Sequence, residues 1–297
     1  MKATIRVACV QAEPVVFERD ATIAKAHALA AEAAAGGAHL VVFPETFVPV
    51  YPSNRWVREL AHGTDGARVW ARLAREAVEV PGPASDALGS AARDAGVWLA
   101  VGVNELERGT IYNALLIYAP DGTLALHHRK LVPTNHERLV WGQGDGRGLD
   151  TVDIGGAKVG GLICWENLMP LARFALYERG VEIYLAPTAE DSDGWLDSMR
   201  HIARESRSFV VSCCVFQRAS SYPGDIPLAP GDELVGRGGS AILSPGGDCL
   251  AGPLWDVEGI LYADLEPDVL YTHRQRFDPA GHYHRPDVLS LVVTPRG

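Results

Sequence analysis

Residues 160–173, with the sequence GGLICWENLMPLAR, constrain the fold more than any other part of the chain. Residues 158–163 are predicted to form a short buried strand, and Pro170 stands where a proline can begin a helix that ends at Gly180. Cys164 therefore lies at a sharp corner between strand and helix, where backbone N–H groups and the helix N-terminus favour thiolate over thiol. Apolar side chains recur along the segment at helical spacing, at Leu168, Leu171, Ala172, Ala175 and Leu176.

The five cysteines can be interpreted in more than one way. Cys164 could instead be a small buried hydrophobic residue, as most intracellular cysteines are. Cys213 and Cys214 are neighbours in a predicted strand and point to opposite faces, which argues against a shared metal ion or a redox disulfide. The odd number and wide scatter of the cysteines disfavour a disulfide framework and indicate a reducing cytoplasm.

Length and composition favour a soluble globular protein. Of 297 residues, 47% are hydrophobic and 22% charged, and no linker or composition break divides residues 1–297, so we expect a single domain. A net charge of −10 without any run of Lys or Arg disfavours nucleic acid as a partner. The N-terminus lacks the pattern of a signal peptide, and no apolar run is as long as a membrane span, so we expect a cytoplasmic protein without membrane contact.

Strands and helices alternate along the chain, and their order after Cys164 resembles their order before it. This alternation predicts a layered α/β architecture with helices covering the sheets. Besides residues 158–163, strands are expected at residues 3–12, 40–43, 97–107, 110–118, 123–130, 182–187, 209–217 and 239–254, with turns at 119–122 and 244–248. Besides the helix that begins at Pro170, helices are expected at residues 66–77, 85–96 and 194–208, and in an alanine-rich segment that Asp20 caps and Gly36 and Gly37 end.

Glu45 directly follows the apolar strand of residues 40–43 and Pro44, which ends that strand. Charged residues in loops are usually solvated, but a carboxylate in this setting is a candidate for burial, which costs several kcal/mol unless the carboxylate has a partner. Glu45 is therefore a candidate acid or base. The aromatic-rich and proline-rich stretch that follows suits a pocket wall.

Lys130 and Glu137 form a third candidate site. Lys130 ends an alternating strand, and Glu137 lies in a proline-containing segment too irregular to assign. Alternatively, Lys130 and Glu137 could be a solvated pair that contributes little to stability. For the neighbouring Arg129 and Arg138, a solvated position is the better interpretation. Trp141 and the nearby Gly142, Gly144 and Gly146 could bring backbone close to Lys130 and Glu137, as the wall of a site requires.

These residues lie at strand ends or in the loops that follow, so they can converge at the carboxyl edge of a sheet, where α/β proteins bind ligands. No histidine has a comparable position, so a carboxylate is the natural base for the thiol of Cys164. The ammonium of Lys130 could lower the pKa of that thiol and stabilise negative charge on a substrate.

Four motifs in this order resemble the nitrilase superfamily, and its nitrilase branch most closely. They are FPETF with Glu45, HRKLVPT with Lys130, NHERLVWGQGDG with Glu137 and GGLICWENLMPLAR with Cys164, and the similarity extends to GHYHRPDV near the C-terminus. The resemblance implies a four-layer α-β-β-α sandwich without metal or organic cofactor, which dimerises through helices. The helix after Cys164 is then a candidate dimer contact. Because longer relatives carry a C-terminal tail that supports filaments, we expect a homodimer or another small homo-oligomer here.

The resemblance also implies a Glu-Lys-Cys triad that hydrolyses a small-molecule nitrile to a carboxylic acid and ammonia. Cys164 would attack the nitrile carbon while Glu45 accepts its proton, which gives a thioimidate. Lys130 would stabilise the developing nitrogen anion, and Glu137 would orient the lysine and the water. A thioester would follow and be hydrolysed with Glu45 as base.

Several aromatic and polar side chains are candidates for substrate binding. Tyr51, Trp141 and Trp165 lie beside the motif residues, and Thr188 and Trp195 are weaker candidates; ordinary core packing is the alternative for each of them. Four histidines could suggest a metal site, but surface or interface positions are the better interpretation. They are His136, His273, His282 and His284.

The sequence is also compatible with three alternatives to a nitrilase. Within the superfamily, the same triad could serve an amidase or carbamoylase, or an enzyme that degrades cyanide. From a different class, a non-catalytic assembly or binding protein could retain the fold. The choice among aromatic, arylaliphatic and aliphatic nitriles depends on the shape of the pocket, and whether acid or amide is released depends on which bond of the tetrahedral intermediate breaks.

Overall fold

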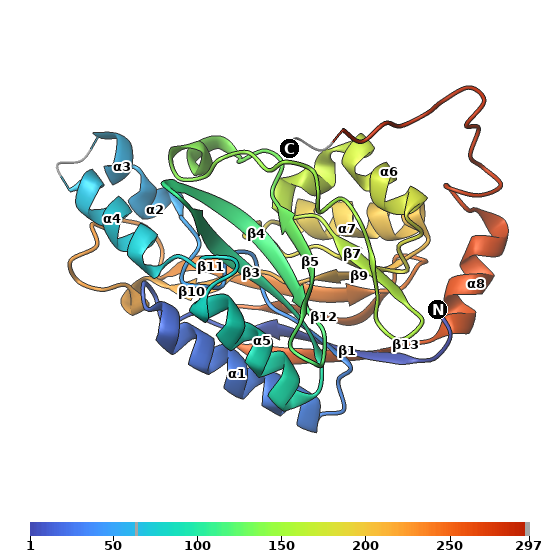
Figure 1. Cartoon of the computed structure of the whole chain (residues 1–297), viewed down its shortest axis with the longest axis horizontal. Helices are drawn as coiled ribbons and strands as arrows, with labels where there is room; N and C mark the ends of the chain where they lie inside the picture. The colour runs from blue at the N-terminus through green and yellow to red at the C-terminus, as the bar shows by residue number, and fades with distance from the viewer. Residues whose placement is uncertain (63–64, 295–297) are drawn as a thin grey trace.

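The computed structural model describes residues 1–62 and 65–294. Two β-sheets pack face to face, and helices cover the outer face of each (Figure 1). α1 (Arg19–Ala35) and α5 (Pro83–Ala95) pack together on the first sheet, whereas α7 (Asp193–Ser206) packs on the second sheet with α6 (Pro170–Glu178) nearby. The layers therefore follow the order α-β-β-α, which confirms the predicted fold class.

The first sheet has six strands in the order β13-β1-β2-β3-β4-β5. The strands are β1 (Ile5–Gln11), β2 (Leu40–Val42), β3 (Trp98–Glu107), β4 (Thr110–Tyr118), β5 (Leu124–Arg129) and β13 (Gly259–Leu265). β1, β2 and β3 run parallel, and β13, β4 and β5 are antiparallel to their neighbours. The carboxyl ends of β2 and β5 consequently lie in the same sheet, although β3 and β4 separate them.

The second sheet has seven strands, six of them in the order β10-β11-β9-β8-β7-β6, and β12 pairs with β11. The strands are β6 (Val152–Asp153), β7 (Lys158–Gly161), β8 (Ile183–Leu185), β9 (Phe209–Ser212), β10 (Phe216–Arg218), β11 (Leu234–Leu243) and β12 (Cys249–Trp255). β7, β8 and β9 are parallel. β8 and β9 are buried along their whole length, as their apolar sequences require, and β7 is buried from Val159 onward.

The remaining elements lie at the margins of the sandwich. They are the helices α2 (Asn54–Val57), α3 (Glu59–His62), α4 (Gly66–Glu76) and α8 (Pro267–Arg276), and the 3₁₀ turns η1 (Asn135–Leu139), η2 (Cys164–Leu168) and η3 (Ala219–Ser221). Within the described residues, the structure contains no helix whose length and apolar character would suit it to crossing a membrane.

A continuous hydrophobic core fills the space between the sheets. The facing strands contribute side chains that include Val7, Val42, Leu115, Ile117, Leu185, Phe209 and Ile242. Cys213 belongs to this core, and its thiol contacts the carbonyl oxygens of Val10 and Val42 in the first sheet. Cys214 packs in the cluster under α6 and α7. The two neighbouring cysteines thus face opposite sides, as predicted.

Some local expectations were wrong. Asp20 does not cap α1: Glu18 holds the N-cap position, and the carboxylate of Asp20 accepts a hydrogen bond from Arg19 inside the first turn. The expected strand of residues 209–217 is interrupted because the backbone N–H of Cys214 donates to the hydroxyl of Ser240. β13 and α8 were not predicted, because β13 buries only two residues and α8 only one.

The apolar positions of α6 divide into two groups. Ala172, Ala175 and Leu176 are buried under the helix, whereas Leu171 is 69% exposed. Leu168, in η2, is 48% exposed. The apolar positions predicted from the sequence of residues 168–176 therefore cover more of the helix surface than the monomer buries.

The core between the sheets gives a stability prediction. Leu185 is fully buried there, so Leu185→Ala should lower the free energy of unfolding by about 2–5 kcal/mol, because a cavity adds to the lost transfer energy. Leu124→Ala, at the exposed start of β5, should cost about 0.5 kcal/mol or less. Denaturant titration of both variants measures the difference. Equal costs would mean that Leu185 does not support the packing of the sheets.

Candidate active site

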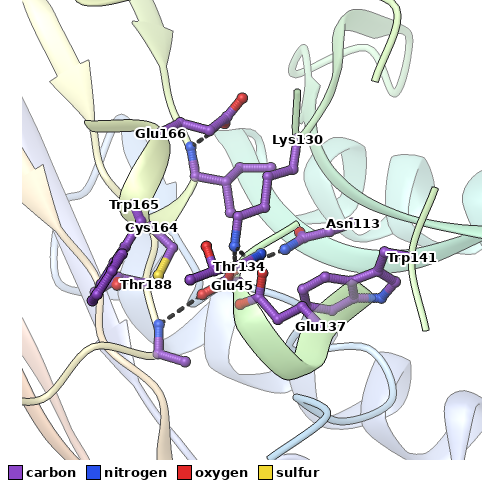
Figure 2. Close-up of polar contacts among 12 residues, drawn as sticks. Glu45, Asn113, Lys130, Thr134, Glu137, Trp141, Cys164, Trp165, Glu166 and Thr188 are labelled. Atoms are coloured by element: carbon purple, nitrogen blue, oxygen red, sulfur yellow. Dashed lines mark hydrogen bonds and ion pairs between the residues drawn. The ribbon is translucent and has the colours of Figure 1, made fainter. Parts of the chain in front are cut away.

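The sequence-predicted residues Glu45, Lys130, Glu137 and Cys164 come together at one end of the sandwich (Figure 2). Glu45 follows β2 and Lys130 follows β5, both in the first sheet, while Cys164 follows β7 in the second. The sequence argument placed them at the edge of one sheet. The structure shows that both sheets contribute, because the carboxyl ends of β2 and β7 meet across the core.

The ammonium of Lys130 lies between two carboxylates. Its Nζ donates to Oε1 of Glu45 at 2.9 Å and to Oε2 of Glu137 at 2.7 Å. All three side chains are buried, with exposed fractions of 1% or less. The side-chain amide of Asn113 donates to Oε1 of Glu45, and the backbone N–H of Ala189 donates to Oε2, each at 2.7 Å. Every oxygen of Glu45 thus has at least one donor.

Glu137 is fixed by its own turn. The segment that the sequence left unassigned is η1, in which Glu137 and Thr134 form a capping box. The backbone N–H of Thr134 donates to Oε2 of Glu137 at 2.6 Å, and the hydroxyl of Tyr51 donates to Oε1 at 2.9 Å. The carboxylate is therefore held on both oxygens before any substrate arrives.

Cys164 begins η2 and lies in the left-handed region, with φ of +52°. Its backbone N–H donates to the carbonyl of Pro187 at 2.9 Å. Thr46, beside Glu45, and Asn135, near Glu137, also have positive φ. Such conformations cost of order 1–3 kcal/mol each and cluster at functional sites. The backbone is strained in all three segments that supply the carboxylates and the thiol.

Burial raises the pKa of the Cys164 thiol, and the carboxylates of Glu45 and Glu137 raise it further. Lys130 and a hydrogen bond from Thr188 lower it, but they do not offset burial. The expectation that the corner favours a thiolate was therefore wrong, because the backbone dipoles at the corner act in a dry site with two carboxylates. The structure favours a neutral thiol in the resting protein.

Burial also raises the pKa of Glu45, although Lys130 and Asn113 oppose this shift. Burial alone would lower the pKa of Lys130, but the carboxylates of Glu45 and Glu137 raise it above its ordinary value. Lys130 therefore stays charged, while Glu45 and Cys164 are a base and an acid whose protonation depends on each other.

Ligand atoms of Glu45, Glu137 and Cys164 lie within 4.8 Å of one another and could in principle hold a metal ion. The ammonium of Lys130 already binds both carboxylates and would repel a cation there. The arrangement is better suited to proton transfer. Among residues 1–62 and 65–294, none of the four histidines discussed above belongs to a group of three or more metal-ligating side chains.

The predicted substrate-binding residues occupy different positions. Tyr51 lines a small cavity beside Glu45, and Trp141 is buried against Lys130 and donates to Asn104. Thr188 lies close enough to Cys164 to lower the pKa of its thiol. Of the two remaining tryptophans, Trp165 is 43% exposed and donates to Glu190, and Trp195, which belongs to α7, is buried and donates to Ser212. Whether any of them contacts substrate stays a prediction.

Sequence reasoning missed several residues of the site. Asn113 could have been found as a polar residue inside the apolar strand of residues 110–118. Glu166 and His128 form a buried pair next to the site, and a carboxylate two residues after Cys164 was a visible signal. No signal in the sequence marks the backbone N–H of Ala189, because any residue supplies that donor.

The fold and the site together define a class, the α-β-β-α proteins with a buried Glu-Lys-Cys group. A family model for carbon-nitrogen hydrolases matches residues 6–275. The chain belongs to the carbon-nitrogen hydrolase family, within the nitrilase superfamily that the motifs resemble.

Individual relatives agree with this assignment. The chain is 45% identical over 293 residues to an aliphatic nitrilase from Sinorhizobium fredii, covering 97% of this chain and 95% of the relative. It is 41% identical over 300 residues to Nitrilase 1 from Arabidopsis thaliana, covering 98% and 87%. Among solved structures, Saccharomyces cerevisiae Nit3, a member of branch 10 of the nitrilase superfamily, superposes with a TM-score of 0.74 at 21% identity, covering 95% and 97%.

Close backbone contact at Gly102 gives a prediction for the site. A Cβ on Gly102, in β3, would lie 2.3 Å from the carbonyl oxygen of Pro44 and 2.4 Å from the N of Thr46, so Gly102→Ala must displace Glu45. We expect about a 10²-fold loss of hydrolytic activity, because small misplacements of catalytic groups are costly. Gly109→Ala is the matched control, since its Cβ would meet nothing within 4 Å. Full activity in Gly102→Ala, measured beside this control, would contradict the inferred displacement of Glu45.

Proposed function

We propose that this chain is a nitrilase, which converts an organic nitrile to a carboxylic acid and ammonia through intermediates on Cys164. The observation that carries the proposal is the buried group of Glu45, Lys130 and Cys164 in a chain 41–45% identical to curated nitrilases over nearly its whole length. The contacts of this group support a nucleophile, a base and a cation in adjacent positions.

In the first step, Glu45 accepts the proton of the Cys164 thiol, and the sulfur attacks the nitrile carbon. A C–S bond forms, and one electron pair of the C≡N bond moves to nitrogen. Lys130 lies next to Glu45 and stabilises this developing anion until the nitrogen takes up the proton that Glu45 removed from the thiol, which returns Glu45 to its carboxylate form. The product is a thioimidate ester of Cys164.

In the second step, water adds to the thioimidate carbon and gives a tetrahedral intermediate. Glu45 removes a proton from the water, and the nitrogen leaves as ammonia, which produces a thioester. A second water then cleaves the C–S bond, so that the acid is released and the thiol is restored. Glu137 holds Lys130 and, through it, the relative position of Glu45. If the C–S bond of the tetrahedral intermediate breaks instead, an amide is released.

The shifted pKa values support this role for Glu45. Burial and carboxylate charges hold the proton on Cys164, and burial raises the pKa of Glu45, which makes it a better proton acceptor. The proton can therefore pass from sulfur to Glu45 when the substrate carbon is in reach. A nitrilase that acts in this way does not need a permanent thiolate.

The amidase, carbamoylase and cyanide-degrading alternatives use the same residues, so only substrates separate them from a nitrilase. The test measures ammonia from benzonitrile, phenylacetonitrile, a dinitrile and cyanide, beside the matching amides. We expect ammonia from at least one organic nitrile and not from the matching amide. The ratio of acid to amide among the products of that nitrile is measured in the same assay. Ammonia from amides alone would contradict the nitrilase proposal, and release from cyanide alone would indicate the cyanide-degrading alternative.

The same assay tests the catalytic residues. Cys164→Ala and Glu45→Gln should each lower turnover by at least about 10³-fold with the fold retained, because each removes a group that takes part in bond formation. Cys249→Ala is the control, because this exposed cysteine lies on β12. Substantial activity in Cys164→Ala, or equal losses in Cys249→Ala, would contradict the assignment of Cys164 as nucleophile.

We also propose that the protein is a homodimer that uses the face of η2 and α6. The exposed side chains of Leu168 and Leu171 support this proposal, since the fold leaves them without partners in the monomer.

The five free cysteines support a reducing compartment such as the cytoplasm.

Light scattering coupled to size exclusion tests the dimer. Leu171→Glu should halve the measured mass, because a carboxylate would be buried without a partner in the interface. Leu250→Glu, at a 45% exposed position on β12, should leave the mass unchanged. A wild-type monomer, or a Leu171→Glu variant with unchanged mass, would contradict this interface.

A further inference from the structure

A second buried polar pair, His128 and Glu166, lies next to the site and takes no part in the mechanism described above. Glu166 is 1% exposed and His128 is fully buried. The Nε2 of His128 lies 3.0 Å from Oε2 of Glu166 and 3.3 Å from Oε1. Two buried groups of this kind would destabilise the fold if they were unpaired. The pairing of Glu166 with His128 therefore stabilises both side chains in the buried region beside Lys130 and Cys164.

Glu166 also binds two backbone N–H groups. Its Oε1 accepts from the N–H of Leu131 at 2.6 Å, and its Oε2 accepts from the N–H of Ile163 at 2.7 Å. Leu131 is the residue after Lys130, and Ile163 is the residue before Cys164. Figure 2 shows Glu166 beside the segment that carries Lys130.

The two backbone segments come from different sheets. Lys130 and Leu131 follow β5 of the first sheet, and Ile163 follows β7 of the second. The side chain of Glu166 therefore crosses the gap between the sheets at the position where the ammonium and the thiol must meet. His128, on β5, adds a third contact from the first sheet.

The charge state of Glu166 suits this role. Burial would raise the pKa of Glu166, but the charge and hydrogen bond of His128 and the two backbone N–H donors lower it below its ordinary value. A carboxylate accepts hydrogen bonds on both oxygens, so it can serve all three donors at once. A neutral side chain of the same size has fewer acceptor positions.

We propose that Glu166 is a positioning residue that fixes the distance between Lys130 and Cys164 by binding the backbone beside each of them, with His128 as its buried partner. Glu166 does not touch the reacting atoms. Its effect on turnover rests on the proposed nitrilase function, whereas its effect on the thiol of Cys164 does not. These two effects can be measured separately.

Glu166→Gln is the central variant. The amide keeps the size of the side chain, but its NH₂ group donates and cannot accept, so at least one donor among Leu131, Ile163 and His128 loses its partner. Lys130 and Cys164 should then shift relative to each other. We expect kcat to fall by about 10²-fold with KM changed by no more than about threefold, because the lost interaction positions catalytic groups.

The thiol is measured by alkylation with iodoacetamide at neutral pH, with peptide mass spectrometry to separate the cysteines. Because Lys130 lowers the pKa of Cys164, its displacement should slow alkylation of Cys164 about tenfold in Glu166→Gln. The exposed Cys249 in the same molecule should react at its wild-type rate. The ratio of the alkylation rates of Cys164 and Cys249 can be measured without any substrate.

Glu182→Gln is the matched control. Glu182 is also buried and also accepts from a backbone N–H on β7, that of Lys158, but it lies at the opposite end of that strand. Glu182→Gln should keep the wild-type kcat and the wild-type ratio of alkylation rates.

If Glu166→Gln does not fold, His128→Asn is the second variant. Its shorter side chain does not reach Glu166, and it should slow Cys164 in the same direction by a smaller factor.

The outcomes separate the two proposals. If the wild-type protein hydrolyses no nitrile, the nitrilase proposal fails, and the ratio of alkylation rates still tests the role of Glu166. If a folded Glu166→Gln alkylates Cys164 at the wild-type rate or faster, or loses no more kcat than Glu182→Gln, the positioning role is wrong. Wild-type rates in His128→Asn would exclude His128 as the partner that matters.

Discussion

The buried ammonium of Lys130 is the interaction on which the rest of the site depends. Moving such an ion from water into a dry interior costs of order 20 kcal/mol in the idealised limit, more than the net stability of most domains. Lys130 is 1% exposed and is held by Glu45 and Glu137. Removing either carboxylate would leave the buried ammonium with one charged partner instead of two. The three segments that carry these residues must therefore assemble together with the fold.

The packing of the two sheets makes this assembly possible. β2 and β5 deliver Glu45 and Lys130 from one sheet, and β7 delivers Cys164 from the other. Glycines at close contacts let the segments approach: a Cβ on Gly144 would lie 2.2 Å from the carbonyl oxygen of Arg129, directly before Lys130. Strained residues and glycines at the same place indicate that chain geometry at the site is set by function and stabilised by the core around it.

The sequence predicts the parts of the site that depend on local pattern. An apolar run that ends in Pro44 and Glu45, and a strand that ends at Cys164, are visible without tertiary information. The contact between the two sheets was not visible, because it depends on which strands become neighbours. The protonation of Cys164 was predicted wrongly for the same reason: the corner was considered without the two carboxylates that the other sheet and η1 bring to it. Donors such as the backbone N–H of Ala189 leave no trace in the side-chain pattern.

The raised pKa of Cys164 is compatible with a nucleophilic role, because the relevant proton does not leave the site. If Cys164 lost its proton to water, the buried group would gain one negative charge in a medium that solvates it poorly. If the proton passes instead to the carboxylate of Glu45, the total charge of the group is unchanged, and the new thiolate lies near Lys130. The cost of activation is then the difference between two arrangements of the same charge. That difference depends on the distance between Lys130 and Cys164, and the contacts of Glu166 with Leu131 and Ile163 span this distance.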